Sequence, residues 1–377
     1  MTFPDRSCTI HRLDPKKRFS LGVTGLYELP VEALDPRTQP TEQVSPCPVC
    51  GNRQATPRFV VAGLDTPVVV CTHCGLGRFH PTPDPAAVRA LYPDEYYGEP
   101  GTKFQPLIES LVRLIGARHI GFLSRNLPPR ARVLDVGCGR GVLLGALADQ
   151  GFEVHGVEIS AGAVHGADPR AEVRIASRLR DADYPSSNFD EVILWHVFEH
   201  MADPAETLEE VHRILAPGGR VVIAVPNFES AQARWTGASW FHLDLPRHLF
   251  QFPLSALREL LEKTGFEVIS EHHFSLRQNP FGWVQSFLNR LPGLPRNGLY
   301  TLLHQRSAGE PLPYDARTRF WLWFWLVVGS PLGLVATVLE TAFRSGATVH
   351  VVARKPDGGR SRSQADSSHA RHGRSST

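Results

Sequence analysis

The chain has 377 residues, of which 42% are hydrophobic and 21% are charged. This is an ordinary globular composition, and the length allows two domains with an ample core. The 40 lysines and arginines nearly balance 38 acidic residues, and the net charge is +2. A nucleic-acid surface usually needs a concentrated basic footprint, so we expect no nucleic-acid partner. The N-terminus lacks the order of a signal peptide, so we expect a cytoplasmic protein.

Four cysteines follow a polar, proline-interrupted stretch, residues 1–44, that we expect to be a loosely ordered leader. They form two C-x-x-C pairs separated by 20 residues, and a glycine directly follows each pair. This spacing is typical of a structural zinc site with four thiolate ligands. Disulfides are the alternative, which a cytosolic protein disfavours. The sequence therefore predicts a zinc-ribbon module over residues 45–98, with zinc held by Cys47, Cys50, Cys71 and Cys74.

Strands and helices alternate after the ribbon, which is typical of a doubly wound α/β sheet. An amphipathic helix is expected over 104–126. The helix after the fourth strand should begin at Asp203 as N-cap and end at 217–219, and another helix should cover 255–264. The predicted strands are 132–136, 153–158, 172–176, 190–195, 220–225, 266–272 and 347–353.

A glycine turn follows the first predicted strand, where Asp135 precedes Gly137, Gly139 and Gly141 and a helical pattern begins at once. Such a strand–turn–helix unit is a site for a nucleotide-like ligand. A carboxylate inside the turn would repel a pyrophosphate but attract the sulfonium and ammonium of S-adenosylmethionine. Glu158, at the end of the second strand, can accept both ribose hydroxyls. The two acids together favour S-adenosylmethionine over NAD.

These features resemble the class I S-adenosylmethionine-dependent methyltransferases. The resemblance rests on residues 135–141, Glu158, 189–200 and 215–219, and it spans roughly 130–272. It implies a seven-stranded Rossmann-like sheet whose last two strands form an antiparallel edge pair. The ribbon resembles the leader of some bacterial sugar C-methyltransferases. The cofactor-binding residues that the resemblance implies are Asp135, Gly137, Cys138, Gly139, Gly141, Glu158, Ile159, Trp195 and His196.

Two histidines are the catalytic candidates. His196 follows the fourth strand in a block similar to that of quinone O-methyltransferases, where a Glu-Val-x-Glu-His pattern can hold a divalent metal. His196 replaces the first glutamate of that pattern, so we predict no metal there. His248 lies in residues 240–252, a segment that in sugar C-methyltransferases carries the proposed base. Packing is the alternative role of His248. Further candidates for the acceptor pocket are Trp240, Asp244, Arg247, Asn279, Gln285 and Asn289.

An apolar insert, residues 273–346, separates the last two predicted strands. Residues 320–339 contain no charged residue, and this stretch of 20 residues is long enough to span a membrane. A simple crossing would separate two strands of one sheet, so the break at 329–331 predicts a helical hairpin. Its tryptophans suit a membrane interface, and we expect 320–343 to contact a membrane surface. A buried lid, a dimer contact and a true span are the alternatives. Residues 357–377 should be disordered.

The sequence thus predicts a methyltransferase domain over 99–356 that acts on a small-molecule O- or C-acceptor. The apolar insert favours a lipophilic or lipid-linked acceptor and a peripheral position on the inner face of the cell membrane. A soluble nucleotide sugar is the alternative acceptor, and a non-catalytic S-adenosylmethionine-binding protein is the alternative outside catalysis.

Overall fold

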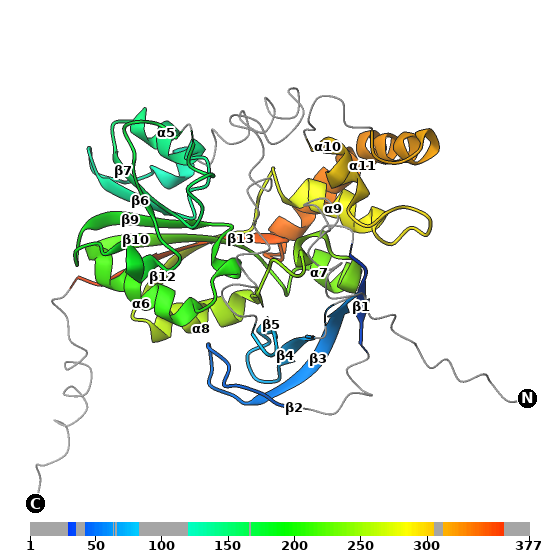
Figure 1. Cartoon of the computed structure of the whole chain (residues 1–377), viewed down its shortest axis with the longest axis horizontal. Helices are drawn as coiled ribbons and strands as arrows, with labels where there is room; N and C mark the ends of the chain where they lie inside the picture. The colour runs from blue at the N-terminus through cyan, green and yellow to red at the C-terminus, as the bar shows by residue number, and fades with distance from the viewer. Residues whose placement is uncertain are drawn as a thin grey trace, which may run out of the picture.

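The computed structural model describes residues 29–34, 42–62, 64, 66–82, 120–165, 167–304 and 312–357. Within them the chain forms two sheets, which lie side by side in Figure 1. Most of the leader, residues 83–119 with most of the predicted helix 104–126, and the tail from 358 lie outside the described residues.

The larger sheet confirms the predicted seven-stranded fold. Its order is β12-β13-β10-β9-β6-β7-β8, and β13 is antiparallel to both of its neighbours. The antiparallel pair at the edge that the resemblance implied is present, formed by β12 and β13. The strands are β6 (Arg132–Val136), β7 (Glu153–Glu158), β8 (Glu172–Ile175), β9 (Phe189–Trp195), β10 (Leu215–Pro226), β12 (Glu267–His272) and β13 (Thr348–Arg354).

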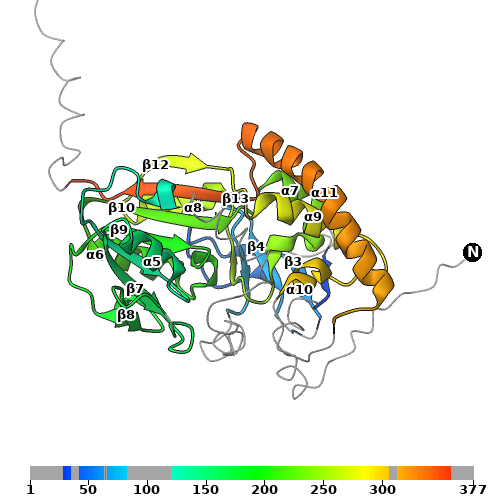
Figure 2. The same ribbon diagram turned by 90° about the horizontal axis from the view of Figure 1, so that it is seen from above.

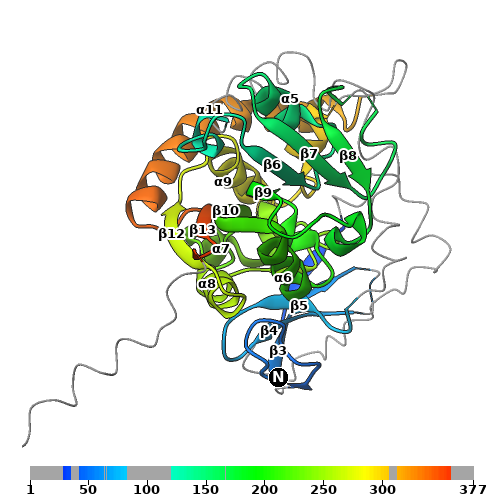
Figure 3. The same cartoon turned by 90° about the vertical axis from the view of Figure 1, so that its left-hand side faces the viewer.

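Both faces of this sheet are covered, as parallel strands require. Successive side chains alternate between two cores: Val133 joins the core on the α5 side, and Leu134 joins the larger core on the other side. Figures 1 and 3 show α5 on one face and α6 and α8 on the other. These helices are α5 (Val142–Ala148), α6 (Pro204–Ile214) and α8 (Leu254–Lys263).

Helix α6 begins where it was predicted to begin. The Asp203 side chain accepts a hydrogen bond from the backbone N–H of Glu206 at 3.0 Å, which satisfies a free donor of the first turn. The helix ends at Ile214, earlier than predicted, because residues 215–219 already belong to β10. The pairing of β10 with β9 is irregular between Leu215 and Arg220, so the glycines form a bulge instead of a helix stop.

The smaller sheet is the ribbon, with order β1-β3-β4-β5-β11 and β2 beside β3. Its last strand, β11, comes from the middle of the methyltransferase-like part of the chain. The first two strands lie in the stretch assigned to the leader, so the ribbon sheet begins before residue 45. The strands are β1 (Val31–Ala33), β2 (Glu42–Gln43), β3 (Gln54–Val61), β4 (Val68–Cys71), β5 (Gly77–Phe79) and β11 (Phe250–Gln251).

The insert forms α9 (Asn279–Leu288), α10 (Gly298–Leu303) and α11 (Ala316–Ala342). The predicted hairpin is wrong, because α11 is one helix that continues through Pro331. Proline removes the backbone donor for the Val327 carbonyl, and the Ser330 hydroxyl donates to the neighbouring Leu326 carbonyl. In addition, a Cβ at Gly333 would lie 2.7 Å from the Pro280 carbonyl oxygen of α9. Close packing on α9 holds both halves of the helix in line.

Helix α11 lies along the outer edge of the molecule (Figure 2). Its buried residues, Leu322, Gly333, Thr337 and Glu340, form a narrow stripe. Most of its apolar side chains are instead exposed, including Phe320, Val327, Leu332, Val335 and Val338. Within the described residues it is the single helix long and apolar enough to cross a membrane, and 17% of its most apolar window is buried.

Candidate active site

The glycine turn after β6 has the tight geometry that the sequence predicts. Gly137, Gly139 and Gly141 have φ angles of 73°, 50° and 69°, a region that favours glycine. A Cβ at Gly137 would lie 2.4 Å from the Val197 side chain. The N–H groups of Gly137 and Cys138 donate to the Val157 carbonyl at 2.7 and 3.1 Å. The turn is thus held against the end of β7.

Glu158 lies directly beside this turn. One of its carboxylate oxygens accepts the N–H of Gly139 at 2.8 Å, and the other accepts those of Ile159 and Ser160 at 2.8 and 3.2 Å. Asp135 is buried on the adjacent strand, and burial together with the charge of Glu158 raises its pKa to about 8. Two carboxylates in one buried place repel each other, so this position suits a cationic ligand with hydroxyl groups.

Cys138 fills space within the turn. Its sulfur lies 2.7 Å from the position that a Cβ would take at Gly156, and burial raises the pKa of its thiol above the ordinary value. A buried thiol with a raised pKa is a poor nucleophile.

Trp195 ends β9 and His196 directly follows it, at the same edge of the sheet as the glycine turn, because the carboxyl ends of parallel strands meet there. Trp195 stacks on His350 of β13, with ring centroids 4.7 Å apart. His196 has a positive φ of 53°, which turns the chain away from the sheet. Its Nδ1 lies 3.7 Å from a Glu199 carboxylate oxygen, and burial lowers its pKa to about 3.

Glu199 lies in η3 (Phe198–His200) and connects His196 to His248. The same carboxylate oxygen, Oε1, is 3.8 Å from His248 Nε2. In the described part of the chain neither oxygen of Glu199 accepts a hydrogen bond, and burial raises the pKa of Glu199 to about 7. The structure places Glu199 between the two candidate histidines.

His248 is buried and its ring is fixed. Its Nδ1 donates to the His242 carbonyl at 2.9 Å, because a carbonyl can only accept. Its Nε2 therefore carries the lone pair, and it lies 3.7 Å from an Asp244 carboxylate oxygen. Burial and the neighbouring His200 lower the pKa of His248 well below its ordinary value. The ring is thus a neutral imidazole whose free nitrogen faces two acids.

Of these two acids, Asp244 is the one that stays ionised over the wider pH range. Arg247 donates to both of its oxygens, and this guanidinium keeps the pKa of Asp244 below its ordinary range despite burial. His200 Nδ1 donates to the Arg247 carbonyl at 2.9 Å. The segment that carries His248 is therefore held by hydrogen bonds within the segment and by a hydrogen bond to η3.

The same cluster has the distances of a metal site. One ligand atom each of Glu199, His200 and His248 lies within 4.8 Å of the others. The sequence predicts no metal here, so metal binding is the alternative outcome of the His248 experiment described in the Discussion.

The remaining acceptor-pocket candidates hold the insert together. The Asn279 amide donates to the His273 carbonyl and accepts from Thr348 N–H. Gln285 bonds to Asn289 and Tyr300 in the same way. Trp240 is buried and donates to Gln232 at 3.0 Å, a residue that the sequence did not single out. These side chains make hydrogen bonds within the protein, around α9 and the segments packed against it. We therefore assign them a structural role that supports the site.

The four ribbon cysteines lie together. Cys47 Sγ is 3.6 Å from Cys74 Sγ, and Cys50 Sγ is 3.5 Å from Cys71 Sγ, with all four within 4.8 Å. Sulfurs around one tetrahedral zinc lie about 3.8 Å apart, given Zn–S bonds of about 2.3 Å. Gly51 and Gly75 close the two turns with φ angles of 74° and 75°. The donors therefore fit zinc in number, type and spacing.

Comparisons with known proteins agree with this geometry. A family model described as a methyltransferase domain matches residues 111–271. A ubiquinone biosynthesis O-methyltransferase of Alkalilimnicola ehrlichii is 38% identical over 105 residues, which cover 26% of this chain and 42% of the relative. One of Ruegeria pomeroyi is 29% identical over 216 residues, covering 51% and 85%.

Among solved structures, an S-adenosylmethionine-dependent methyltransferase from Archaeoglobus fulgidus is similar over 65% of this chain and 94% of its own, with 19% identity and a TM-score of 0.40. The chain spans about half the length of the first curated relatives it matches.

Proposed function

We propose that this chain, a member of the class I S-adenosylmethionine-dependent methyltransferase family, transfers a methyl group to a hydroxyl or acidic carbon of a lipophilic small molecule. The observation that carries this proposal is the shared sheet edge. Asp135 and Glu158 lie at the ends of two strands there, and His196 and Glu199 follow β9, the strand beside β6. His248, from the segment after β10, lies beside Glu199. When bound, S-adenosylmethionine supplies a methyl group on a cationic sulfur, which is a good leaving group.

The residues of the chain have three roles in this mechanism. Glu158 would hold the ribose, and Asp135 would attract the cationic end of the cofactor. His248 would take the acceptor proton on Nε2, because its Nδ1 already carries the proton that it donates to the His242 carbonyl. The imidazolium that forms would lie 3.8 Å from Glu199 and 3.7 Å from Asp244, and these carboxylates stabilise its charge. General-base assistance of this kind contributes about 10²- to 10⁴-fold.

The relatives favour a small-molecule acceptor, because their names state O-methyl transfer in ubiquinone biosynthesis. The lipophilic character rests on the insert. Helix α11 packs against α9, and α9 reaches the site because a Cβ at Gly282 would lie 2.5 Å from His242 Nε2. Helix α11, which carries the exposed apolar surface, and the histidine segment thus both contact α9.

Labelled S-adenosylmethionine tests the proposal directly. The full chain is incubated with host extract, and the extract is then divided into lipid and aqueous phases. We expect enzyme-dependent label in the lipid phase. Label in a soluble sugar nucleotide would support the alternative acceptor. If no label depends on the enzyme although the protein binds S-adenosylhomocysteine, the chain is a non-catalytic binding protein.

We further propose that the four ribbon cysteines hold one structural zinc, which leaves no ligand position open for catalysis. The bond from Cys74 lowers the pKa of Cys47 to about 5, and thiolates are the form that binds metal. We expect elemental analysis of purified protein to find about one zinc per chain. A Cys71→Ser/Cys74→Ser variant should lose it, whereas Cys138→Ser should keep it. Wild-type protein without zinc would contradict the assignment.

We also propose that the exposed face of α11 rests on an anionic membrane surface. Its length is about 40 Å at 1.5 Å per residue, Trp321 and Trp323 are partly exposed, and Arg317 and Arg344 flank the uncharged stretch. Glu340 accepts a hydrogen bond from Trp283 on α9, so the C-terminal end stays anchored to the protein. An interfacial helix fits these features better than a span.

Vesicle flotation tests this contact. We expect the wild type to float with phosphatidylglycerol-rich vesicles and Val327→Glu/Leu332→Glu to remain at the bottom, because charges disfavour the apolar boundary. These residues are 70% and 64% exposed, so the fold should tolerate the change. The matched control, Ile175→Glu/Ile269→Glu, alters residues that are 50% and 52% exposed elsewhere and should float. If the wild type stays at the bottom of the gradient and is a stable dimer, the partner of this α11 face is a second copy of the chain and not a membrane.

A further inference from the structure

The ribbon and the His248 segment belong to one sheet. Strand β11 pairs with β5 of the ribbon in antiparallel register, with Phe250 opposite Arg78 and Gln251 opposite Gly77. The ladder continues toward the histidine, because Phe79 N–H donates to the Leu249 carbonyl at 3.4 Å. Backbone bonds to the ribbon therefore begin at the residue after His248.

The contact between β5 and β11 is too close for a side chain. A Cβ at Gly77 would lie 2.8 Å from Gln251 Cβ, and one at Gly75 would lie 3.3 Å from Pro253. Gln251 is buried and donates to the carbonyls of Leu243 and His248 at 3.1 and 3.4 Å. The residue that touches Gly77 thus also holds both sides of the histidine loop.

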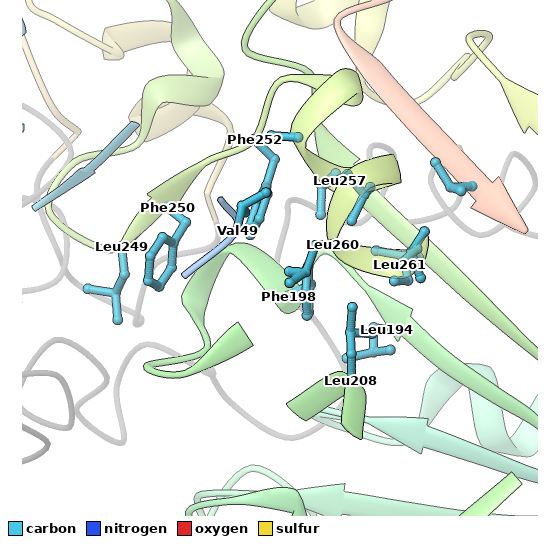
Figure 4. Close-up of a cluster of buried hydrophobic side chains, with 14 of the residues drawn as sticks. Val49, Leu194, Phe198, Leu208, Leu249, Phe250, Phe252, Leu257, Leu260 and Leu261 are labelled. Atoms are coloured by element: carbon cyan, nitrogen blue, oxygen red, sulfur yellow. The ribbon is translucent and has the colours of Figure 1, made fainter. Parts of the chain in front are cut away.

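The cysteine turns determine where β5 lies. Cys71 N–H donates to the Leu76 carbonyl at 2.9 Å, and Gly75 N–H donates to the Cys71 carbonyl at 3.0 Å. On the other turn, Lys263 of α8 donates to the Val49 carbonyl at 2.7 Å. Figure 4 shows Val49 of the ribbon beside Phe252, Leu249 and Phe250 in one cluster with Phe198. The ribbon and the reacting segment share a core as well as a sheet.

We propose that the cysteine ribbon is a positioning element of the active site, which holds His248 in register through the β5–β11 pair. Gly77 is the positioning residue in this arrangement, since it acts through Gln251. Its backbone is not in the left-handed region, so an added methyl group has one principal effect, which is to displace β11. Without the ribbon, residues 249–251 would lose the backbone of β5, and the backbone bond from Phe228 N–H to the Phe252 carbonyl lies four residues beyond His248.

Gly77→Ala in the full chain tests this, with Gly121→Ala as the control because nothing lies within 4 Å of a Cβ at Gly121. We expect kcat to fall about 100-fold, the cost of misplacing a reacting group by about 1 Å, with an unchanged KM for S-adenosylmethionine. Hydrogen exchange should accelerate in residues 249–252 and stay slow in β6 and β7. Cys71→Ser/Cys74→Ser should give the same exchange pattern.

The kinetic part rests on the proposed function, but the exchange part needs no acceptor, so failure of one can be distinguished from failure of the other. Unchanged exchange in 249–252 would overturn the proposal. Faster exchange with the kcat of the Gly121→Ala control would also overturn it, because the segment would then move without consequence. Weaker S-adenosylhomocysteine binding would do the same, because the ribbon would then support the whole fold.

Discussion

Replacing His248 with alanine lowers the rate of methyl transfer by about 100- to 10,000-fold and leaves S-adenosylhomocysteine binding intact, if His248 is the general base. The reason is its fixed tautomer. The His242 carbonyl holds the proton on Nδ1, so Nε2 is the acceptor at every pH at which the ring is neutral. Its lowered pKa keeps the ring neutral at pH 7, and the rate should fall only in acid, as the ring becomes protonated.

His212→Ala is the matched control, because His212 packs on Phe266, away from the candidate site, and its loss should leave the rate unchanged. A turnover of His248→Ala equal to that of the control would assign His248 to packing. Elemental analysis separates base from ligand. If the wild type binds a second metal that His248→Ala loses, the histidine acts with Glu199 and His200 as a ligand, and its role as base is wrong.

Local patterns in the sequence predicted the parts of the site that local physics determines. Asp135 and the glycines that follow it lie at a strand end, and both the strand period and the need for positive φ can be read from neighbouring residues. The C-x-x-C spacing likewise predicted the cysteine cluster, since each turn is short and closed by a glycine.

The features that the sequence missed depend on contacts between distant segments. Strand β11 has two residues, and nothing in Phe250 and Gln251 indicates a partner at residues 77–78. The helix break predicted at Pro331 fails for the same reason, because Gly333 packs on a carbonyl of α9. The role of Glu199 also depends on a contact between distant segments: its neighbour His196 is local, but His248 lies 49 residues further along the chain.

Asp135→Asn should weaken S-adenosylmethionine binding by about 10- to 150-fold, because a charge-assisted contact contributes about 1.5–3 kcal/mol. The wild type offers a sharper measurement. Burial and Glu158 raise the pKa of Asp135 to about 8, and the sulfonium favours the ionised carboxylate. The affinity for S-adenosylmethionine should therefore rise as the pH increases toward 8 and level off above it.

S-adenosylhomocysteine provides the control ligand, because it shares the amino and carboxylate groups but lacks the sulfonium charge. The ratio of the two dissociation constants, measured by calorimetry from pH 6 to 9, then isolates the effect of Asp135. In the wild type this ratio should change by about tenfold for each unit by which the sulfonium lowers the pKa of Asp135, always in favour of S-adenosylmethionine at higher pH. In Asp135→Asn the ratio should be flat, since no group that faces the sulfonium titrates. A pH-independent ratio in the wild type would mean that Asp135 is already ionised or does not face the sulfur, and the choice of S-adenosylmethionine over a phosphate-bearing nucleotide would then rest on Glu158 and the glycine turn alone.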